Sequence, residues 1–480
     1  MCFWIYMRYF KRKDTVYHHP EHPSVQTSDS RFGARHVQCL MAFLGLGMAY
    51  CMRVNLSVAI VSMTQKSTGT DFPVLPWDES MKGTILSSFF WGYLLLQVPA
   101  GQLAEKFGPK FLLAGTVFFS GFVTVLTPYA AIHGGFYWMV ATRILQGAVQ
   151  GFLLPCANVL VAKWTPAPER GRIFTWVFNG TKFGILVTMP VAGYLADSPW
   201  GWPSIFYVSG GAAILWSILY CYIGANSPQE HPTISESERK YILSSMPSSS
   251  PQQKMLKTPW KAILTSIPMW AIAVAHTSLA WGYWTLLTQI PSYVNSVMGI
   301  NLKKSGLLSA LPYLTSFVMA FVFSAICDWM INKEILSRSA SKKIWSCVAM
   351  WGPAFALCIL AFSGKHAILA LSMLIAAVAP NSAIFLGFLS NHIDLSPNFA
   401  GTLMGITNGL SNIGSVAAPL FAGYIVTDTT SLIQWQIVFL TSAAIFFFGN
   451  LIFIIFGTVK IQPWNFAPEE QTPKVTPAVE

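Results

Sequence analysis

Charged residues are scarce in this chain of 480 residues: Asp, Glu, Lys and Arg make up 10% of it, where a soluble protein carries roughly 25%. Hydrophobic residues make up 53%, and the mean hydropathy is +0.50. This scarcity of charge excludes a soluble domain and predicts a membrane protein. The apolar stretches are long, not short and alternating, so they predict helical spans instead of a membrane β-barrel.

Sequence patterns for metal binding, catalysis and secretion are also missing. The eight cysteines are scattered, and no CxxC or Cys/His cluster predicts a metal site or a disulfide framework. No nucleophile–base pair or nucleotide-binding loop indicates an enzyme. The first ten residues are apolar but too short to span, and no cleavage site follows them, so we expect no signal peptide. The net charge of +11 lies in loops and is explained by membrane topology, so no nucleic-acid partner is expected.

Hydropathy predicts twelve membrane-spanning helices and therefore an all-α membrane protein. A polar segment at 225–262 divides the spans six and six, as in chains built from two helical bundles. The predicted organisation is a cytosolic tail at 1–36, bundles at 37–224 and 263–457, the cytosolic loop between them, and a cytosolic tail at 458–480. The predicted spans are 37–61, 81–102, 111–131, 136–160, 172–196, 202–224, 264–290, 304–327, 343–363, 366–390, 400–425 and 433–457.

The distribution of basic residues predicts the orientation. With the N-terminus in the cytosol, 22 of the 30 Lys and Arg residues fall in cytosolic segments and five in outer loops. The positive-inside rule therefore favours both termini in the cytosol.

The remaining three basic residues, Arg53, Arg143 and Lys182, lie deep inside apolar stretches that hold no Asp or Glu. A charge at such depth is costly and usually faces a watery cavity or a partner. At 1.5 Å per residue, Arg53 lies ~12 Å and Arg143 ~10 Å from the outer end of its span. Together they could clamp a carboxylate or phosphate. For both arginines the alternative is a structural role. Lys182 is a candidate to contact the substrate by adding positive charge to the pocket, or it could instead pair with a neighbouring helix or lie nearer the cytosol.

The segment GQLAEKFGPK after the second span matches the loop motif of the major facilitator superfamily, with Glu in place of Asp and Pro109 at one basic position. A divergent second copy of the motif, SAICDWM, follows the eighth span. The alternative interpretation is an ordinary positively charged loop. The motif residues are Gly101, Glu105, Lys106, Gly108 and Lys110, with Asp328 in the second copy.

More specific segments resemble solute carrier family 17, which includes sialin, the vesicular glutamate transporters and the sodium–phosphate cotransporters. The carrying segments are RVNLSVAIVSM (53–63), SSFFWGYLLLQVPAG (87–101), RILQGAVQGFLLPCAN (143–158), ERGR (169–172), WAIAVAHTSLAWGYWTLLTQIPSY (270–293), LSALPYL (308–314) and SNHIDLSPNFAGTLMGITN (390–408). The resemblance extends from about residue 36 to 466 and is greatest to arthropod members with phosphate-cotransporter names. It implies a major facilitator fold, anion transport, and substrate contact at Arg53 and Arg143.

Two positions depart from the family pattern. Sialin-like members carry Glu at both positions where this chain has Gln146 and Gln150, and those carboxylates are implicated in proton coupling. Glutamine does not titrate. Coupling here must use another group, use Na⁺, or be absent. Asn158 likewise replaces a family His.

Further polar residues are weaker candidates for the transport path. His276 matches the seventh-span His of the family and is a candidate both for substrate contact and for proton coupling, although a lone buried His is more often a packing residue. Hydroxyl or amide donors to an anion are Tyr93, Tyr313 and Asn408, all of which could equally be packing residues. His392 and Asp394 at the cytosolic end of the tenth span predict a gate or hinge, or a simple helix cap.

The resulting expectation is a monomeric, multi-pass secondary transporter of a small anionic solute that works by alternating access. Phosphate-, sialate-, urate- and glutamate-like anions all fit. No cofactor is expected apart from Na⁺ or H⁺ as a coupling ion. The absence of an acidic dileucine signal favours the plasma membrane. The alternatives are an anion sensor that has lost transport and, as a poorer match, an ion channel.

Overall fold

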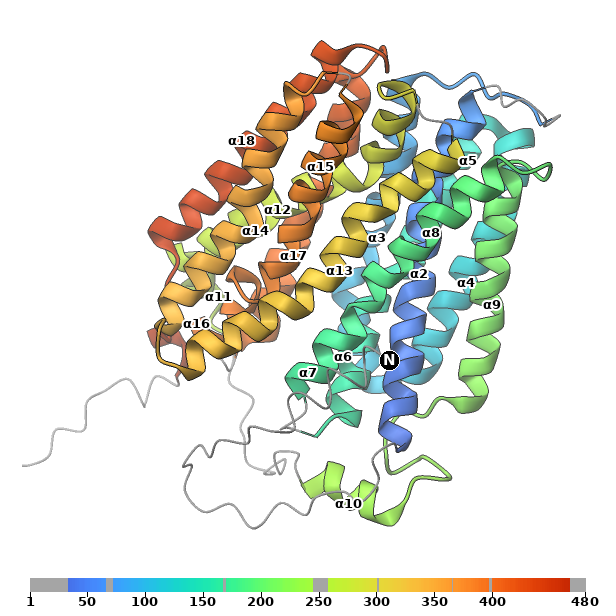
Figure 1. Cartoon of the computed structure of the whole chain (residues 1–480). Coiled ribbons are helices and arrows are strands. Elements are labelled where there is room, and N and C mark those ends of the chain that lie inside the picture. Colours follow the sequence, from blue (N-terminus) through green and yellow to red (C-terminus); the bar gives the residue numbers. More distant parts are fainter. Residues whose placement is uncertain are drawn as a thin grey trace, which may run out of the picture.

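The computed structural model describes residues 33–65, 72–166, 170–244, 258–299, 302–364, 366–396 and 399–466. Within these ranges all regular secondary structure is helical. The helices form two groups that lie side by side, α2 to α9 on one side and α12 to α18 on the other (Figure 1). We refer to them as the N-terminal and C-terminal bundles.

The N-terminal bundle follows the apolar stretches of the first half of the chain. Its elements are α2 (Ala34–Thr64), α3 (Glu79–Phe107), α4 (Pro109–Tyr129), the π-helical turn η1 (Ala130–Gly134), α5 (Gly135–Gln150), α6 (Leu153–Trp164), α7 (Arg170–Phe178), α8 (Gly180–Ala196) and α9 (Pro203–Ile223). The pairs α5–α6 and α7–α8 occupy single predicted spans that are interrupted at 151–152 and at Asn179.

The C-terminal bundle is preceded by two short helices, α10 (Glu236–Ser244) and α11 (Trp260–Leu264). Its elements are α12 (Ile267–Ser296), α13 (Leu302–Asn332), α14 (Arg338–Ala361), α15 (Ala367–Val378), the 3₁₀ segments η3 (Ala379–Phe385) and η4 (Phe388–Ser390), α16 (Asn391–Leu395), α17 (Ala400–Ile425) and α18 (Leu432–Phe456), followed by η6 (Pro463–Asn465). The stretch 367–395 is not one regular α-helix, and we call it the broken tenth span.

Seven helical stretches of the described residues are long and apolar enough to cross a membrane. One of them, Pro109–Trp164, holds 56 residues and contains two predicted spans, because it joins α4, η1, α5 and α6. Within it, α4 and α5 lie against each other. The other predicted spans also fold as helices. Of these, α12 and α17 contain Ser, Thr, Asn or Gln at several positions, and α8 is short because the chain is interrupted at Asn179. The prediction of an all-helical membrane fold is confirmed.

The motif GQLAEKFGPK does not form the loop that we expected. Residues up to Phe107 continue α3, and only Gly108 separates α3 from α4. The chain turns within one residue because Gly108 has φ +83°, which a glycine adopts readily, and Pro109 starts the next helix. The backbone N–H of Lys110 then donates to Oδ1 of Asn226 at 3.0 Å, which ties this turn to the segment after α9.

The two bundles contact each other through α3 with α17, α8 with α13, and α2 with α12. Two of these contacts use glycines in corresponding positions. Gly83, near the start of α3, lies against Gly423 near the end of α17, and Gly306, near the start of α13, lies against Gly193 near the end of α8. These crossings leave no room for a side chain, so they bring the backbones of the two bundles close together at one end.

The helix α10 lies against the other end of the N-terminal bundle (Figure 1). Its Glu238 is buried and accepts hydrogen bonds from the backbone N–H groups of Ala34 and Arg35, at 2.9 and 3.2 Å. The Arg35 guanidinium also donates to Glu238, at 3.3 Å. This carboxylate therefore satisfies the first N–H groups of α2, the position where a helix favours negative charge.

The predicted cytosolic tails fall largely outside the described residues, which begin at 33 and end at 466; part of the central loop, 245–257, is outside them as well. The bundle boundaries and the cytosolic orientation of these segments stay predictions.

Candidate functional site

Arg53 projects from the middle of α2 and is 5% exposed. Its Nε and Nη2 donate to Oε1 of Gln150 on α5, at 3.2 and 3.0 Å. The partner is a neutral amide and not a carboxylate. The guanidinium is therefore oriented by a neighbouring helix while its charge is left uncompensated by that contact.

Four aromatic rings surround the Arg53 guanidinium. Its central carbon lies 4.5 Å from the ring centroid of Tyr50, 4.6 Å from Phe89 and 4.9 Å from Tyr93. Trp284 of α12, at 5.7 Å, supplies the fourth ring from the C-terminal bundle. We call these four rings the aromatic cage. Ring faces attract a cation, so the cage stabilises Arg53 without neutralising it.

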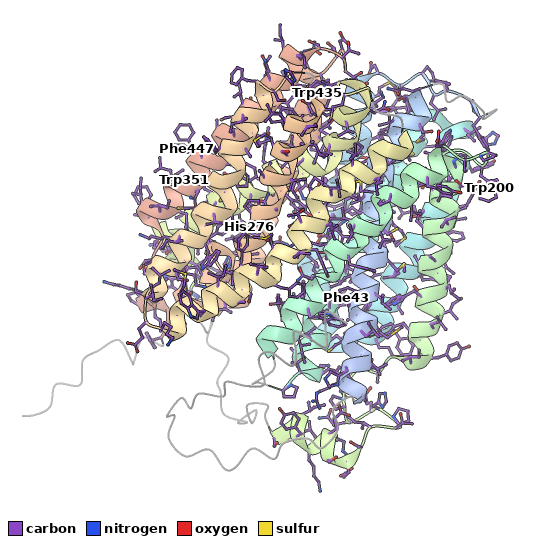
Figure 2. All side chains as sticks on the ribbon, viewed as in Figure 1. Phe43, Trp200, His276, Trp351, Trp435 and Phe447 are labelled. Carbon is purple, nitrogen blue, oxygen red and sulfur yellow. The ribbon has the colours of Figure 1, made fainter. Side chains whose placement is uncertain are left out.

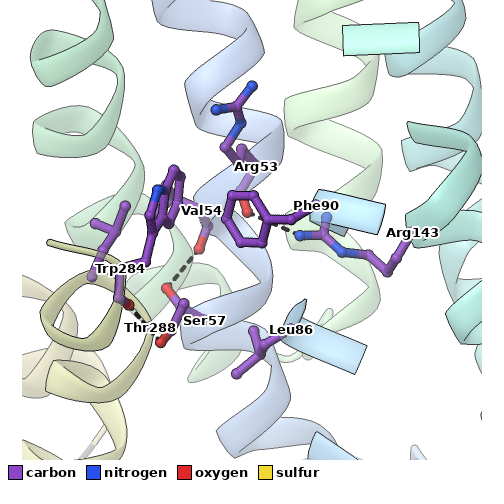
Figure 3. Close-up of a pocket in the computed structure, with 9 residues that line it drawn as sticks. Arg53, Val54, Ser57, Leu86, Phe90, Arg143, Trp284 and Thr288 are labelled. Atoms are coloured by element: carbon purple, nitrogen blue, oxygen red, sulfur yellow. Dashed lines mark hydrogen bonds between the residues drawn. The ribbon is translucent and has the colours of Figure 1, made fainter. Parts of the chain in front are cut away.

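Arg143 reaches the same region from α5 and is 4% exposed. One of its Nη atoms donates to Gln146 on the same helix, and the other donates to the backbone carbonyl of Arg53 at 3.3 Å. Figure 3 shows this guanidinium directed toward α2. Its Nε is buried without a hydrogen-bond partner among the described residues. This N–H donor is therefore unpaired in this conformation.

The two glutamines have their amide nitrogens fixed as well. Nε2 of Gln146 donates to the Met52 carbonyl at 3.2 Å and to Thr124 Oγ1 at 2.8 Å. Nε2 of Gln150 donates to the Ala49 carbonyl at 3.2 Å and to Ser120 Oγ at 2.8 Å. Each amide oxygen accepts from an arginine while its nitrogen donates to a carbonyl. A carboxylate could not make the second of these bonds.

A narrow cavity of about 10 Å³ lies between the bundles beside the two arginines (Figure 3). No residue that lines it is acidic. The lining comes from α2, α3 and α5 on one side and from α12 on the other: Arg53, Val54, Ser57, Leu86, Phe90, Arg143, Trp284, Leu287 and Thr288. Two cationic side chains, no carboxylate in the lining and walls from both bundles make the electrostatics of this cavity suited to an anion, although at this volume the bundles must separate before one can enter.

Lys182 does not line this cavity. It lies near the start of α8, where its Nζ is buried without a hydrogen-bond partner among the described residues. The pairing with a neighbouring helix that we considered as the alternative is therefore not seen there.

Of the predicted hydroxyl and amide donors, only Tyr93 is next to the arginines, as a ring of the aromatic cage. Tyr313 on α13 is buried, and its hydroxyl has no hydrogen-bond partner among the described residues. Asn408 is half-buried on α17. Neither Tyr313 nor Asn408 lines the cavity.

His276 is likewise separate from the cavity. It lies in the C-terminal bundle (Figure 2), eight residues before Trp284 along α12, and contacts Thr407 and Phe388. His392 and Asp394 lie in α16; Asp394 forms an ion pair with Lys342 of α14 at 3.3 Å.

Most of the loop-motif residues are not described beyond their backbone. Gly101 and the side chains of Glu105, Lys106 and Asp328 lie outside the described part of the structure.

Sequence reasoning missed the apolar and aromatic half of the site. Four residues of this half lie in segments that carried the family resemblance but were not singled out as candidates: Phe89 and Phe90 on α3, and Trp284 and Thr288 on α12. Aromatic residues are common at helix contacts, so nothing local marks Phe89 and Trp284 as ring partners of Arg53.

Comparisons with known proteins identify the family of the chain. A sequence profile of the Major Facilitator Superfamily matches residues 42–419. The Drosophila melanogaster protein named "Putative inorganic phosphate cotransporter" is 37% identical, over 95% of this chain and 92% of its own length. Vesicular glutamate transporter 1 of Xenopus tropicalis is 35% identical, over 91% of this chain and 77% of its own length. Human sialin is 32% identical over 93% of each chain.

Solved structures support the fold. A bacterial homologue of the human lysosomal transporter Spinster, crystallised in an inward-facing and occupied conformation, has a TM-score of 0.66 at 13% identity, covering 91% of this chain and 99% of its own. A D-xylose–proton symporter has a TM-score of 0.62 at 17% identity, covering 88% of this chain and 99% of its own. At these identities the likeness concerns the fold alone.

Proposed function

Because the chain belongs to the Major Facilitator Superfamily and, within it, to the solute carrier family 17 group, we propose that it carries a small anion across a membrane by alternating access. The anion binds between Arg53 and Arg143 in the cavity between the bundles. The observation that carries this proposal is the convergence of two buried guanidiniums on a cavity whose lining has no carboxylate.

The electrostatics of the cavity favour an anion over a neutral solute. Two buried cations close together repel each other, and an anion relieves both this repulsion and the loss of hydration. Gln150 and the aromatic cage orient Arg53, while Arg143 keeps Nε available. A carboxylate or phosphate matches the planar donors of a guanidinium. Phosphate-, sialate-, urate- and glutamate-like anions are the proposed substrate class, in keeping with the names of the relatives.

The drive for uptake is proposed to come from Na⁺ or the membrane potential. The family resemblance implies that sialin-like members carry carboxylates at the positions of Gln146 and Gln150. Here both amides are held by arginine on one side and by a backbone carbonyl on the other. They cannot take up a proton at any physiological pH. The plasma membrane is the proposed location, and the chain is proposed to act as a monomer.

An uptake screen in proteoliposomes tests the proposal. Radiolabelled phosphate, urate, sialate, glutamate and aspartate are supplied separately under an imposed Na⁺ gradient, pH gradient or membrane potential. We expect saturable uptake of at least one anion under Na⁺ or potential, with little accumulation under a pH gradient alone. Specific anion binding without flux in any condition would contradict transport and favour the sensor alternative.

A further inference from the structure

Two hydrogen-bond donors without acceptors lie at the junction of α7 and α8. Nδ2 of Asn179 and Nζ of Lys182 are both buried and have no hydrogen-bond partner among the described residues. Asn179 is 4% exposed, and Lys182 follows it by one helical turn. Side chains of a helix lean toward its N-terminus, so Lys182 extends toward Asn179. An ammonium and an amide nitrogen only donate, so the group that this junction lacks is an acceptor.

The helical position of Lys182 directs it toward the other bundle. Gly184 of α8 lies against Gly47 of α2, whereas Gly193 lies against Gly306 of α13. At 3.6 residues per turn, Lys182 is on the side of Gly193, three turns away, and opposite to Gly184. The helices α8 and α13 run side by side (Figure 1). Lys182 therefore faces α13, at the contact between the two bundles.

Contacts of α8 with α2 give the depth of Lys182. Gly47 lies against both Gly180 and Gly184, so Lys182 is at about the depth of Gly47. Arg53 follows Gly47 by six residues on α2, about 9 Å at 1.5 Å per residue. Lys182 is thus nearer than the arginines to the end where α2 begins, which we predict to face the cytosol.

The facing side of α13 adds further donors and no acid at this depth. Ser309 and Tyr313 follow Gly306 by three and seven residues, so they are on the side that meets α8. Their hydroxyl groups are buried without a hydrogen-bond partner among the described residues. The sequence of α8 contains no Asp or Glu, and the acid of α13, Asp328, is near the far end of that helix. The crossing therefore combines donors with nothing negative to compensate the ammonium.

The bundles are held less closely toward the predicted cytosolic end. On α17, Gly423 lies against Gly83 of α3. Gly405, five turns earlier on the same side of α17, has nothing within 4 Å of a Cβ among the described residues. Separation of the bundles from this end would uncover Lys182 without breaking the glycine crossings at the other end.

We propose that Lys182, with Asn179 beside it and Tyr313 on the facing helix, forms a second anion-binding position between the arginines and the cytosol. This position rests on the proposed function: it takes the carboxylate or phosphate group of the solute after the guanidiniums release it. An ammonium is a point charge without the planar fork of a guanidinium, so it holds the anion less firmly than the arginine pair does. Lys182 therefore sets the affinity for the anion on the cytosolic side.

The first test does not require transport. In a background without native cysteines, Asn179→Cys is treated with an impermeant anionic methanethiosulfonate or a cationic one, added on the predicted cytosolic side of membrane vesicles. The anionic reagent should be preferred at least fivefold more with Lys182 than with Lys182→Gln, because its charge attracts the sulfonate, and Lys182→Arg should retain the preference. Val187→Cys, at a 42% exposed position of α8 that we expect to face lipid, should react with neither reagent.

Two outcomes of this labelling would overturn the proposal. One is an equal preference with and without Lys182, which would show that the ammonium does not act on anions there. The other is the absence of any reaction at position 179, which would show that the junction is not reached from that side.

The second test measures exchange of labelled inorganic phosphate and of labelled glutamate in right-side-out and inside-out vesicles. Lys182→Gln should raise the half-saturating concentration about tenfold on the cytosolic face, as for loss of one charged hydrogen bond, and leave the outer face within twofold. Lys182→Arg should restore most of the affinity. An unchanged cytosolic value, or an equal change on both faces, would overturn the proposal. Absent exchange of both anions with charge-dependent labelling at position 179 would count against the proposed function alone.

Discussion

At the scale of single residues, the main property of the site is that its two arginines are oriented by neutral partners. Gln150 and Gln146 supply amide oxygens, and the aromatic cage supplies ring faces. Charge is therefore held in position but not compensated. A carboxylate in either place would neutralise an arginine, so on the proposed function the two amides matter for anion binding.

Replacing Gln150 with glutamate should create proton coupling. The ionised carboxylate would pair with Arg53, oppose anion binding, and face the Ala49 carbonyl without a donor. A proton would relieve both conflicts, so proton and anion should enter together. In Gln150→Glu, a pH gradient at fixed voltage should raise the steady-state accumulation ratio above that of wild type. Equal ratios in the two proteins would show that this position is not alternately exposed with the anion.

The ring of Trp284 should contribute to anion affinity, because it is the one member of the aromatic cage that comes from the other bundle. It also packs edge-on against Phe90, with ring centroids 4.5 Å apart. Trp284→Ala should raise the KM for the anion roughly tenfold, in the range of a desolvated cation–π contact. Trp284→Phe should recover most of the affinity. Trp138→Ala, which removes a ring that is 65% exposed on α5, is the matched control.

At the scale of helices, close contact between the bundles depends on glycine in both crossings. A Cβ at position 306 would overlap the Met189 carbonyl and the backbone of Gly193. The pair Gly83 and Gly423 repeats this arrangement between α3 and α17. These crossings lie at the end that we predict to face outward, so they belong to the conformation in which that side is closed.

Gly306→Val should keep the outer ends of α8 and α13 apart. Overpacking of such a contact costs about 1–3 kcal/mol, enough to slow turnover roughly tenfold. Ser57→Cys, in a background without native cysteines, should then react faster with an impermeant thiol reagent added outside. Gly115→Val is the control, because nothing lies within 4 Å of a Cβ at that position. Unchanged labelling and turnover in Gly306→Val would refute this role.

Glu238 should anchor α10 to the start of α2. Glu238→Gln removes the charge that pairs with Arg35 and caps the helix, so the free energy of unfolding should fall by about 3 kcal/mol, as for other buried ion pairs that lose one partner. A lower thermal midpoint of the purified protein would report it. Glu236→Gln on the same helix is the control: its pair with Arg239 is exposed, and the midpoint should not change. Equal midpoints for both variants would contradict the anchor.

At the scale of the whole molecule, hydropathy was sufficient to predict an all-helical membrane fold, because long apolar stretches have few other solutions in a bilayer. The interruptions at 151–152, at Asn179 and in the broken tenth span were not predicted. They change the backbone of a span without changing its hydropathy. In the broken tenth span, the contacts with Ser346 and Thr407 come from helices that only the tertiary structure brings near.

The arginines of the site were predictable because a charge without an acid is conspicuous in an apolar helix. Matched depths along α2 and α5 placed Arg53 and Arg143 together, and the structure has one bonded to the backbone of the other. Lys182 carried the same local signal but lies away from the cavity, since depth alone does not say which face of α8 meets it. The aromatic cage combines three helices and has no such local signal.

The central claim is that the transported anion binds the two guanidiniums. It is tested most directly by counterflow of the labelled anion in proteoliposomes containing wild type, Arg143→Ala, Arg143→Lys or the exposed control Arg239→Ala, with equal amounts of folded protein. Loss of a charged hydrogen-bonding partner is worth about 1.5–3 kcal/mol, so Arg143→Ala should lose roughly 10- to 100-fold in apparent affinity. Arg143→Lys should recover little, because it lacks the planar fork. Counterflow by Arg143→Ala with wild-type affinity would contradict the account.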